Sequence, residues 1–335
     1  MYPFISICTP TYNRRPFFEM TKRCFLHQTY PLDRMEWVIV DDGTDKIEDI
    51  VLEIKQVKYF PLESKITLGA KRNLMHQKAS GEYIVYMDDD DYYPPDRVLH
   101  AIQVLMENPN IYCVGCSVLH TYFNDTKQMY RFGPYGDNHA TAATMAFRKT
   151  MLSITSYDET SCLAEEKHFL KNYTIPIIQL DPLKTILVFS HSQNTFDKRI
   201  LLEKPSDFVR LSTLSLDDFL DEKTKQFIVN DMETILEIYE PGKIKNKPDV
   251  LKQIEEIAEK RKEREREQKK HHIEKLMSMN PLELANMYEK QIYETFTLLN
   301  ETKRLLETEK EKNKYLTNKI TEIIQKSIRD KSLQT

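Results

Sequence analysis

Three short apolar segments, each followed at once by polar residues, constrain the fold of this chain most. They are Phe4–Cys8 before Thr-Pro-Thr-Tyr-Asn, Trp37–Val40 before Asp-Asp-Gly, and Tyr83–Met87 before four consecutive aspartates. Short runs that are apolar throughout are typical of buried parallel strands. Because the carboxyl ends of parallel strands meet at one edge of a sheet, we expect the three polar segments to gather there and bind a ligand.

Segments with the apolar spacing of a helix alternate with these strands. Helices are predicted over residues 15–28, 45–56, 69–79, 96–107, 163–173 and 206–240. Further strands are predicted over residues 112–119, 144–147 and 185–189. Alternation of strands and helices predicts an α/β fold built on a parallel sheet.

The composition of the chain changes after Pro248. All seven glycines lie at or before Gly242, and residues 259–270 are charged at every position except Gln268. A helix that is charged all round has no face for a core and must be solvated. We therefore expect a folded domain over residues 1–240, a charged helical linker over 241–280, and a C-terminal helix or coiled coil over 281–335.

The last segment has the spacing of a weak coiled coil. A coiled coil buries two positions of each seven-residue repeat, and these positions form its seam. From Ala285 to Ile320, the first seam position is apolar in every repeat except at Asn313. The second seam position includes three polar residues, Thr295, Thr302 and Glu309. An asparagine in the seam favours a two-stranded register. Two arrangements remain open: a homodimer through this helix, and packing of the helix on the first domain.

Composition argues against several classes of protein. No apolar run approaches the roughly 18 residues of a membrane-spanning helix, and the N-terminus lacks the pattern of a signal peptide. The formal net charge of -4 argues against a general nucleic-acid partner. The five cysteines are scattered and odd in number, which argues against a disulfide framework. We expect a soluble protein of a reducing compartment, the cytoplasm.

The aspartate run Asp88–Asp91 requires positive charge nearby, because adjacent carboxylates repel one another. If the strand continues, Asp88 and Asp90 point to one side, where their oxygens could bind a hard divalent cation. Mg²⁺ or Mn²⁺ held by one or two carboxylates and by substrate phosphates is a common arrangement. A solvated acidic turn is the alternative. The position directly after an apolar strand favours the metal site.

Four motifs in this chain together resemble those of the family 2 glycosyltransferases. The motifs are Thr9–Arg14, Val40–Thr44, Gly69–Asn73 and Gly81–Asp91, and their order and spacing also match. The resemblance covers about residues 3–195 and does not include the C-terminal third. It implies the Rossmann-like GT-A fold. It also implies transfer of a hexose or N-acetylhexosamine from a UDP-sugar to an acceptor hydroxyl, with Mn²⁺ or Mg²⁺ and inversion at the anomeric carbon.

The resemblance also implies roles for the nucleotide-binding residues. Tyr12 and the backbone at Pro10 would contact the uracil, and Asp41 or Asp42 would accept a hydrogen bond from its ring N–H. Arg72 would approach the base or the diphosphate. The acceptor is not defined by these motifs, so a glycan, a protein or another molecule remains open.

The aspartate run corresponds to the DXD motif of the family. Asp88 and Asp89 match the residues that reach the ribose and the sugar, and Asp90 matches the metal ligand. His191 follows a later apolar strand, as does the histidine that completes the metal site in many relatives. Lys198 and Arg199, just beyond it, either clamp the diphosphate or are solvated.

The expected catalytic base lies in an acidic pair at the start of a predicted helix. Inversion in a single displacement requires a carboxylate near the acceptor hydroxyl. Glu166 matches the second acid of the family's pair and is our first choice for the base, with Glu165 as the second. The family commonly has aspartate at this position, so the side chain here is longer by one methylene.

Two alternative functions come from other classes. A nucleotidyltransferase would share the sheet and the metal carboxylates, but we would expect a glycine-rich phosphate loop after the first strand, where residues 9–15 contain no glycine. A non-catalytic scaffold that binds nucleotide sugars and oligomerises through its C-terminal coiled coil is the second alternative. The intact acidic motifs favour the enzyme.

Overall fold

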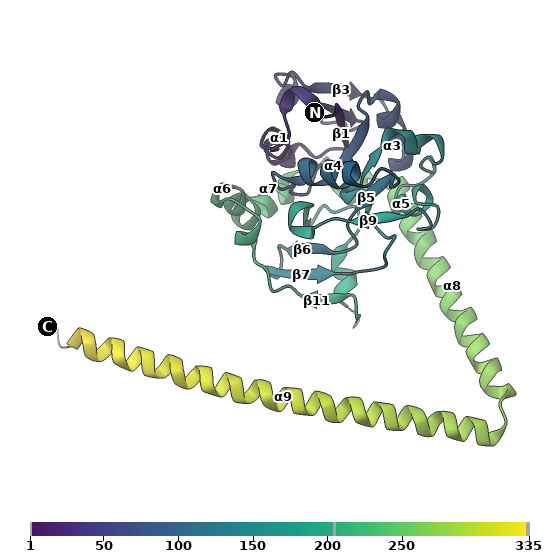
Figure 1. The fold of residues 1–335 in the computed structure, drawn as a ribbon, viewed down its shortest axis with the longest axis vertical. Coiled ribbons are helices and arrows are strands. Elements are labelled where there is room, and N and C mark those ends of the chain that lie inside the picture. Colours follow the sequence, from purple (N-terminus) through teal and green to yellow (C-terminus); the bar gives the residue numbers. More distant parts are fainter. Residues whose placement is uncertain (1, 204–205, 333–335) are drawn as a thin grey trace. The chain divides into compact units, whose positions relative to one another are not determined.

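The computed structural model describes residues 2–203 and 206–332, with side chains through residue 324 (Figure 1). Two compact units are distinguished, Met1–Ile257 and Ala258–Thr335. The first unit therefore extends beyond residue 240, the boundary that composition suggests, and residues 241–257 pack within it. This difference matters for the site described below.

A seven-stranded sheet forms the centre of the first unit. Its strands are β1 (Ile5–Thr11), β2 (Met35–Asp41), β3 (Val57–Pro61), β4 (Tyr83–Tyr86), β5 (Cys113–Gly115), β8 (Ala146–Arg148) and β9 (Ile177–Gln179). The order across the sheet is β3-β2-β1-β4-β8-β5-β9. β1 pairs in parallel with both β2 and β4, as predicted, whereas β8 runs antiparallel between β4 and β5. The strand β3 was not predicted.

The order of the strands reverses at β1. The chain proceeds from β1 outward to β2 and β3, and then returns to the other side of β1 as β4. In open α/β sheets, ligands bind beyond the carboxyl ends of the strands at such a reversal. The segments after β1 and β4, which hold Arg14 and the aspartate run, therefore lie at the expected place for a site.

Helices cover both faces of this sheet. They include α1 (Phe18–Leu26), α2 (Glu48–Val51), α3 (Leu68–Lys78), α4 (Arg97–Glu107) and α5 (Glu166–Phe169). Successive residues of β2 alternate between the two faces: Trp37 packs in one core cluster with Phe25 of α1, and Val38 packs in the other with Met75 of α3. The Phe25 and Trp37 rings stack with their centroids 4.6 Å apart. This two-residue alternation fixes the register of the sheet.

The helix α5 is much shorter than the predicted segment 163–173. Ala164 has a φ of 51°, and Lys171, Asn172 and Tyr173 have φ values of 48°, 56° and 62°. Left-handed backbone at non-glycine residues ends a helix and is enriched at functional sites. The acidic pair Glu165–Glu166 is therefore held in a single short turn.

A smaller four-stranded sheet lies beside the first. Its order is β10 (Leu187–Ser190), β6 (Leu119–Phe123), β7 (Gln128–Phe132) and β11 (Val209–Leu211). The helix predicted over 206–240 is wrong in part, because this segment contains β11 and only then α6 (Glu222–Gln226), a π-helical turn (Phe227–Asp231) and α7 (Met232–Ile238). The side chain of Asp221 accepts a hydrogen bond from the Thr224 N–H and starts α6 there.

Short 3-10 helices complete the first unit. They cover Arg15–Phe17, Leu32–Arg34, Ala142–Thr144, Lys149–Ser153, Pro182–Lys184, Lys198–Leu202, Leu216–Asp218 and Ile244–Asn246. All five cysteines are buried free thiols.

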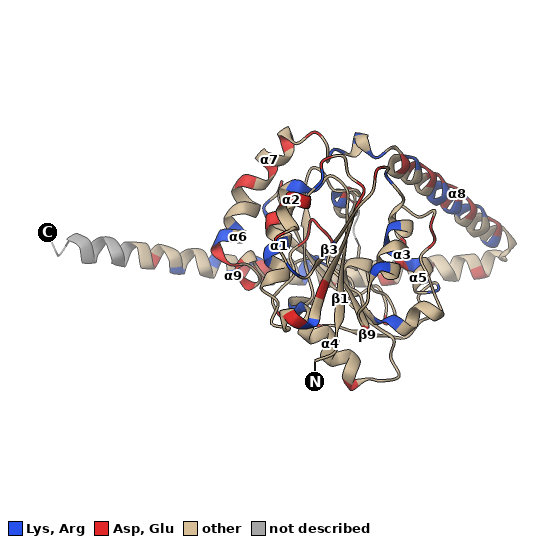
Figure 2. Cartoon of the chain, turned by 90° about the horizontal axis from the view of Figure 1, so that it is seen from above, with Lys and Arg blue, Asp and Glu red and all other residues tan. Residues whose placement is uncertain are grey.

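Two long helices, α8 (Pro248–Ser278) and α9 (Pro281–Ser332), make up the C-terminal region. Lysine, arginine, aspartate and glutamate alternate along the exposed length of α8 (Figure 2), which agrees with the predicted charged helix. Most side chains of α9 up to residue 324 are exposed, including the seam residues Leu299 and Leu306 at 48% and 54%. Within the described residues, no helix has both the length and the apolar character to cross a membrane.

Candidate functional site

A pocket of about 260 Å³ opens at the carboxyl ends of β1 and β4. Its lining includes Pro10, Thr11, Tyr12, Arg14, Lys71, the run Asp88–Asp91, Cys162, Leu163, Asn194, Thr195, Lys198 and Lys247. Of the predicted site residues, Pro10, Tyr12 and the aspartates therefore share one cavity. The lining comes from segments spread between residues 10 and 247, which the fold brings together.

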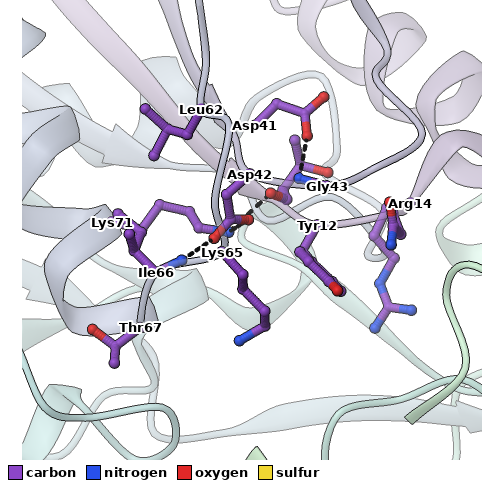
Figure 3. A network of polar contacts seen from close by, with 12 residues as sticks. Tyr12, Arg14, Asp41, Asp42, Gly43, Leu62, Lys65, Ile66, Thr67 and Lys71 are labelled. Carbon is purple, nitrogen blue, oxygen red and sulfur yellow. Dashed lines mark hydrogen bonds and ion pairs between the residues drawn. The ribbon is translucent and has the colours of Figure 1, made fainter. Parts of the chain in front are cut away.

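Lys71 and Asp42 form a buried ion pair at one side of this pocket (Figure 3). Lys71 also donates to the carbonyl of Thr11 at 2.9 Å, and Asp42 accepts from the Ile66 N–H at 2.8 Å. The Lys71 ammonium is 6.0 Å from the centre of the Tyr12 ring. Burial lowers the pKa of Lys71, which the charge of Asp42 opposes. Asp42 and Lys71 therefore position the loop that presents Tyr12.

Asp41 instead stabilises the loop after β2. Its Oδ1 accepts from the Gly43 N–H at 2.9 Å, and its Oδ2 accepts from the Ile47 N–H at 3.1 Å and the Tyr59 hydroxyl at 2.7 Å. The side chain is fully buried. Both oxygens of Asp42 are engaged as well, and neither Asp41 nor Asp42 is among the lining residues of the pocket. Asp41 accepts three hydrogen bonds and Asp42 two, so Asp41 is the less favourable of the two candidates for the uracil N–H.

The four aspartates do not continue β4. The strand ends at Tyr86, so the alternation expected for Asp88 and Asp90 is absent, and the two side chains have different partners. Asp88 binds Arg72 through two contacts of 3.2 and 3.1 Å. Asp90 faces Arg14 instead, with Oδ2 3.4 Å from Nη2.

Arg14 supplies much of the positive charge that the aspartate run requires. It is 3% exposed, and its Nε is 3.8 Å from Asp89 Oδ1. Burial and the charge of Asp90 raise the pKa of Asp89 to about 7, and Arg14 opposes this shift. The Nη1 atom of Arg14 is buried and has no hydrogen-bond partner among the described residues. Sequence reasoning placed Arg14 in a motif without assigning it a role.

Asp90 and His191, the two predicted metal ligands, lie side by side. The Nε2 of His191 is 3.3 Å from Asp90 Oδ2, and the ring packs against Phe17. Burial acts to raise the pKa of Asp90, but the contact with His191 and the charge of Arg14 hold it below its ordinary range. Burial lowers the pKa of His191 to about 4. The imidazole is therefore neutral near pH 7.

These two side chains fit a cation to different degrees. Asp90 is an ionised carboxylate that lines the pocket, as a ligand of Mg²⁺ or Mn²⁺ must be. The Nδ1 of His191 accepts from the Gln193 N–H at 3.2 Å, and the side-chain amide nitrogen of Asn194 lies 2.8 Å from Nε2. Both ring nitrogens are therefore engaged by other groups, and ligation of an ion through Nε2 would displace Asn194. Nowhere in the described chain do three His, Cys, Asp or Glu side chains group closely enough to hold an ion.

Arg72 links the aspartate run to the acidic pair before α5. It is 1% exposed, binds Asp88, and donates from Nε to Glu165 Oε1 at 2.7 Å. Its guanidinium also lies 4.5 Å from the centre of the Tyr86 ring. Burial acts against the charge of Arg72, but Asp88 and Glu165 raise its pKa well above the ordinary value. Arg72 therefore contacts protein carboxylates on both sides.

Glu166, in contrast, makes no ion pair among the described residues. Burial and the charge of Glu165 raise its pKa to about 7, and the Tyr173 hydroxyl lies against it. A carboxylate with a pKa near neutrality is suited to accept a proton at physiological pH. The two acids thus have different environments: Glu165 is paired with Arg72, and Glu166 is not paired with a basic residue of the described chain.

The two basic residues after His191, Lys198 and Arg199, lie in different environments. Lys198 lines the pocket and donates to the carbonyl of Phe189 at 3.2 Å. Arg199 pairs with its neighbour Asp197 at 2.8 Å, and its side chain is 58% exposed. Of the two proposed clamps, only Lys198 faces the pocket. Lys247, which sequence reasoning placed in a linker, also lines it, and no local sequence signal marks that residue.

Comparison with known proteins identifies the domain that holds these motifs. Residues 6–165 match the family model described as Glycosyl transferase family 2. A protein of Bacillus subtilis (strain 168), provisionally named as the teichuronic acid biosynthesis glycosyltransferase TuaG, is 31% identical over 31% of this chain and 43% of its own length. A poly(ribitol-phosphate) beta-glucosyltransferase of Bacillus spizizenii is 32% identical over 33% of this chain and 18% of its own length.

Solved structures of glycosyltransferases are also similar to this chain. The structure of S. aureus TarS 1-349 in complex with UDP has a TM-score of 0.44 at 19% identity, covering 68% of this chain and 69% of that one. The mannosyltransferase PcManGT from Pyrobaculum calidifontis, in complex with GDP-Man and Mn2+, has a TM-score of 0.46 at 15% identity, covering 62% and 66%.

The first curated relatives are matched over less than half of their own length, 43% and 44%. The family match ends at residue 165, directly before the start of α5. It includes every predicted nucleotide-binding residue and the aspartate run, within a mixed α/β fold of the GT-A type. Residues 6–165 of this chain therefore form a glycosyl transferase family 2 domain.

Proposed function

We propose that this chain is a metal-dependent, inverting glycosyltransferase that transfers a hexose or N-acetylhexosamine from a UDP-sugar to an acceptor hydroxyl. The observation that carries the proposal is the chain of contacts from Asp88 through the buried Arg72 to Glu165. It ties the donor end of the site to the acidic pair and leaves Glu166 unpaired beside it. Donor and base are thereby held in one arrangement, as a single displacement requires.

The residues of the pocket can bind each part of the donor. Tyr12 and Pro10 form a surface for the base, with Asp42 as the acceptor of its N–H. Asp88 and Asp89 would accept hydrogen bonds from the ribose and sugar hydroxyls. Arg72 contributes by holding Asp88, since its own donors are engaged by carboxylates.

Asp90 would hold Mn²⁺ or Mg²⁺, with His191 as a second ligand once its Nε2 is released from the Asn194 side chain. The ion, when bound, neutralises the charge that develops on the departing diphosphate. Two protein ligands are compatible with such a site, because substrate phosphates and water supply the others. Arg14 and Lys198 add fixed positive charge around the same pocket.

Glu166 accepts the proton of the acceptor hydroxyl as that oxygen attacks the anomeric carbon. The proton moves to a Glu166 carboxylate oxygen, and the diphosphate leaves with the electron pair of the broken bond. The acceptor, whether glycan, protein or another molecule, is undefined. We keep the cytoplasm as the proposed compartment because all five cysteines are free thiols.

A donor panel tests this function directly. Full-length protein is incubated with Mn²⁺ and with UDP-glucose, UDP-galactose, UDP-N-acetylglucosamine or UDP-N-acetylgalactosamine, and nucleotide release is measured. The name of the Bacillus spizizenii relative places a glucosyl donor first in the panel. Thermal stabilisation by one donor supports the binding step, because a ligand at 100 times its Kd adds about 2.7 kcal/mol. Stabilisation by a donor without any turnover across acceptors would instead support the non-catalytic scaffold.

A further inference from the structure

The segment after α7 packs across the rim of the nucleotide pocket. We call this segment, residues 239–253, the strap. At its beginning, Asn13 Nδ2 donates to the carbonyl of Pro241 at 3.0 Å, and the Tyr12 hydroxyl donates to the carbonyl of Asn246 at 2.9 Å. The strap therefore contacts the same β1 loop that supplies the expected uracil-binding residue.

A glycine allows the strap to approach this closely. A Cβ at Gly242 would lie 2.0 Å from Gln193 Oε1 and 3.0 Å from the carbonyl oxygen of Asn13. Gln193 in turn donates from Nε2 to the carbonyls of Leu236 and Tyr239, both at 2.7 Å. The loop after β10 is thus bound to the strap, and only a residue without a side chain fits between them.

The other end of the strap is bound to the loop before α5. Gln253 Oε1 accepts from the N–H groups of Cys162 and Leu163 at 2.7 and 2.9 Å. Asp249 forms an ion pair with Lys65. Cys162 and Leu163 both line the pocket. The strap is therefore anchored on two sides of the cavity, and Lys247 lies between these anchors.

Lys247 is a buried cation with few partners. It is 5% exposed, and its Nζ donates a single hydrogen bond among the described residues, to Thr195 Oγ1 at 3.0 Å. No carboxylate of the described chain lies within the 4.0 Å of an ion pair. Lys71 is buried to a similar degree, at 4% exposed, but it forms an ion pair with Asp42. An unpaired buried ammonium costs free energy unless an anion reaches it.

The surroundings of Lys247 indicate where that anion would lie. Lys247 and Thr195 line the same pocket as Arg14, whose buried Nη1 also lacks a partner in the described structure. Burial and the charge of Arg14 lower the pKa of Lys247 to about 7, whereas Asp89 and Asp90 oppose this shift. An anion bound in the pocket would favour the charged form of the amine. Two buried basic side chains thus line one cavity. A ligand with at least two negative charges would satisfy both.

We propose that Lys247 binds the diphosphate of the donor nucleotide together with Arg14, so that the strap supplies part of the phosphate site from outside the family 2 domain. This inference rests on the proposed function, because it assumes a nucleoside diphosphate in this pocket. It assigns a binding role to a residue well beyond residue 165, where the family match ends. Lys247 touches the leaving group and therefore also stabilises the charge that develops there.

The test compares a ligand that has the diphosphate with one that lacks it. Affinity of the full-length protein for UDP is measured by isothermal titration calorimetry, and affinity for uridine by ligand-observed NMR. For Lys247→Met we expect UDP to bind at least tenfold more weakly while uridine binding is unchanged. Lys247→Arg should retain most of the UDP affinity. Lys245→Met is the matched control, because Lys245 belongs to the strap but is 67% exposed.

Three outcomes would overturn the inference. Unchanged UDP affinity in Lys247→Met means that the ammonium does not touch the phosphates. An equal loss for UDP and uridine means that the residue only supports the pocket. An equal loss of UDP affinity in Lys245→Met means that affinity depends on the net charge of the strap and not on a contact with Lys247. Lys247→Gln provides the same comparison if the methionine variant does not fold. A wild-type protein that binds neither UDP nor a UDP-sugar would instead refute the proposed function itself.

Discussion

The Nε of Arg72 donates to Oε1 of Glu165 over 2.7 Å, and both side chains are buried. This contact distinguishes two neighbouring glutamates that the sequence presents as near equivalents. The charge of Glu165 is compensated by Arg72, which also holds the side chain in place. Glu166 has no ion pair within the described structure, and its pKa is raised. A base must release and accept a proton, so the unpaired acid is the better candidate.

Substitution of each glutamate by glutamine should therefore have a different effect. Glu166→Gln should lower kcat by roughly 100- to 10,000-fold, the usual contribution of a general base, and leave the Kd for UDP unchanged. Steady-state kinetics and calorimetry measure the two quantities on the same protein. Unaltered turnover in Glu166→Gln would remove this residue from the mechanism.

Glu165→Gln is the matched variant. It removes one carboxylate from the buried Arg72 and should lower the free energy of unfolding by about 3 kcal/mol, the lower end for breaking a buried ion pair. Urea denaturation followed by circular dichroism measures this loss. If Glu165→Gln abolished turnover without loss of stability, the assignment of the two acids would be reversed.

The pH dependence of the reaction should report the ionisation of Glu166. Burial and the charge of Glu165 raise its pKa to about 7. Because the base acts in its ionised form, kcat/KM should rise as the pH increases through about 7 and then reach a plateau. Below that value, each decrease of one pH unit should lower kcat/KM tenfold. The residual activity of Glu166→Gln should lose this acidic limb, and a limb that persists in the variant belongs to another group.

Removal of the metal ion should stop the reaction, because the ion stabilises the departing diphosphate. Asp90 is the expected protein ligand of this ion. Chelation with EDTA should abolish turnover, and added Mn²⁺ should restore it. Asp90→Asn should lower kcat by roughly 100-fold or more and raise the Mn²⁺ concentration required for half-maximal activity, since a bound ion contributes several kcal/mol. Asp125→Asn, a change at an exposed aspartate, should behave as wild type. Full activity in EDTA would exclude a metal role for Asp90.

His191→Gln addresses the second predicted ligand. Glutamine retains a donor that can reach Asp90 but binds these ions poorly. If His191 only orients Asp90 through its Nε2, the Mn²⁺ requirement should change little. A large rise in the Mn²⁺ requirement would show that His191 binds the ion. Manganese titration of the two variants in parallel separates these roles.

The parts of the fold that the sequence predicts best are those with strong local patterns. The strands β1, β2 and β4 were predicted from the mainly apolar runs Phe4–Cys8, Trp37–Val40 and Tyr83–Met87, and α4 was predicted because its apolar residues recur at helical spacing. The short α5 was not predicted correctly, because left-handed backbone at Lys171, Asn172 and Tyr173 ends the helix. These residues have no local property that requires such a conformation.

The site was predictable only where its residues follow strands. Tyr12 and the aspartate run could be found because they come directly after β1 and β4, at the reversal of strand order. Lys247 could not be found, because its place in the pocket depends on the strap returning to the β1 loop. Composition grouped it with the charged helix that begins at Pro248. Contacts across such sequence separations are a property of the folded chain alone.

The exposed seam of α9 predicts the assembly of the protein. Leu299 and Leu306, one heptad apart, are about half exposed, and Ile292 and Ile320 are 69% and 57% exposed. A helix with such a stripe is stabilised when a second copy covers it, and Asn313 at the seam favours two strands. We therefore expect the full-length protein to be a homodimer. The double variant Leu299→Lys and Leu306→Lys should be a monomer at the same concentration, because buried lysines disfavour the pairing.

Size-exclusion chromatography with light scattering gives the mass of each protein. The matched control is Thr297→Lys with Arg304→Lys, which changes α9 at positions outside the seam and should leave the dimer intact. Nucleotide binding by the monomeric variant should equal that of the wild type, because the pocket is built within residues 10–247. A wild-type protein that is monomeric over the whole concentration range would leave the other arrangement, packing of α9 on the first unit, as the way in which this stripe is covered.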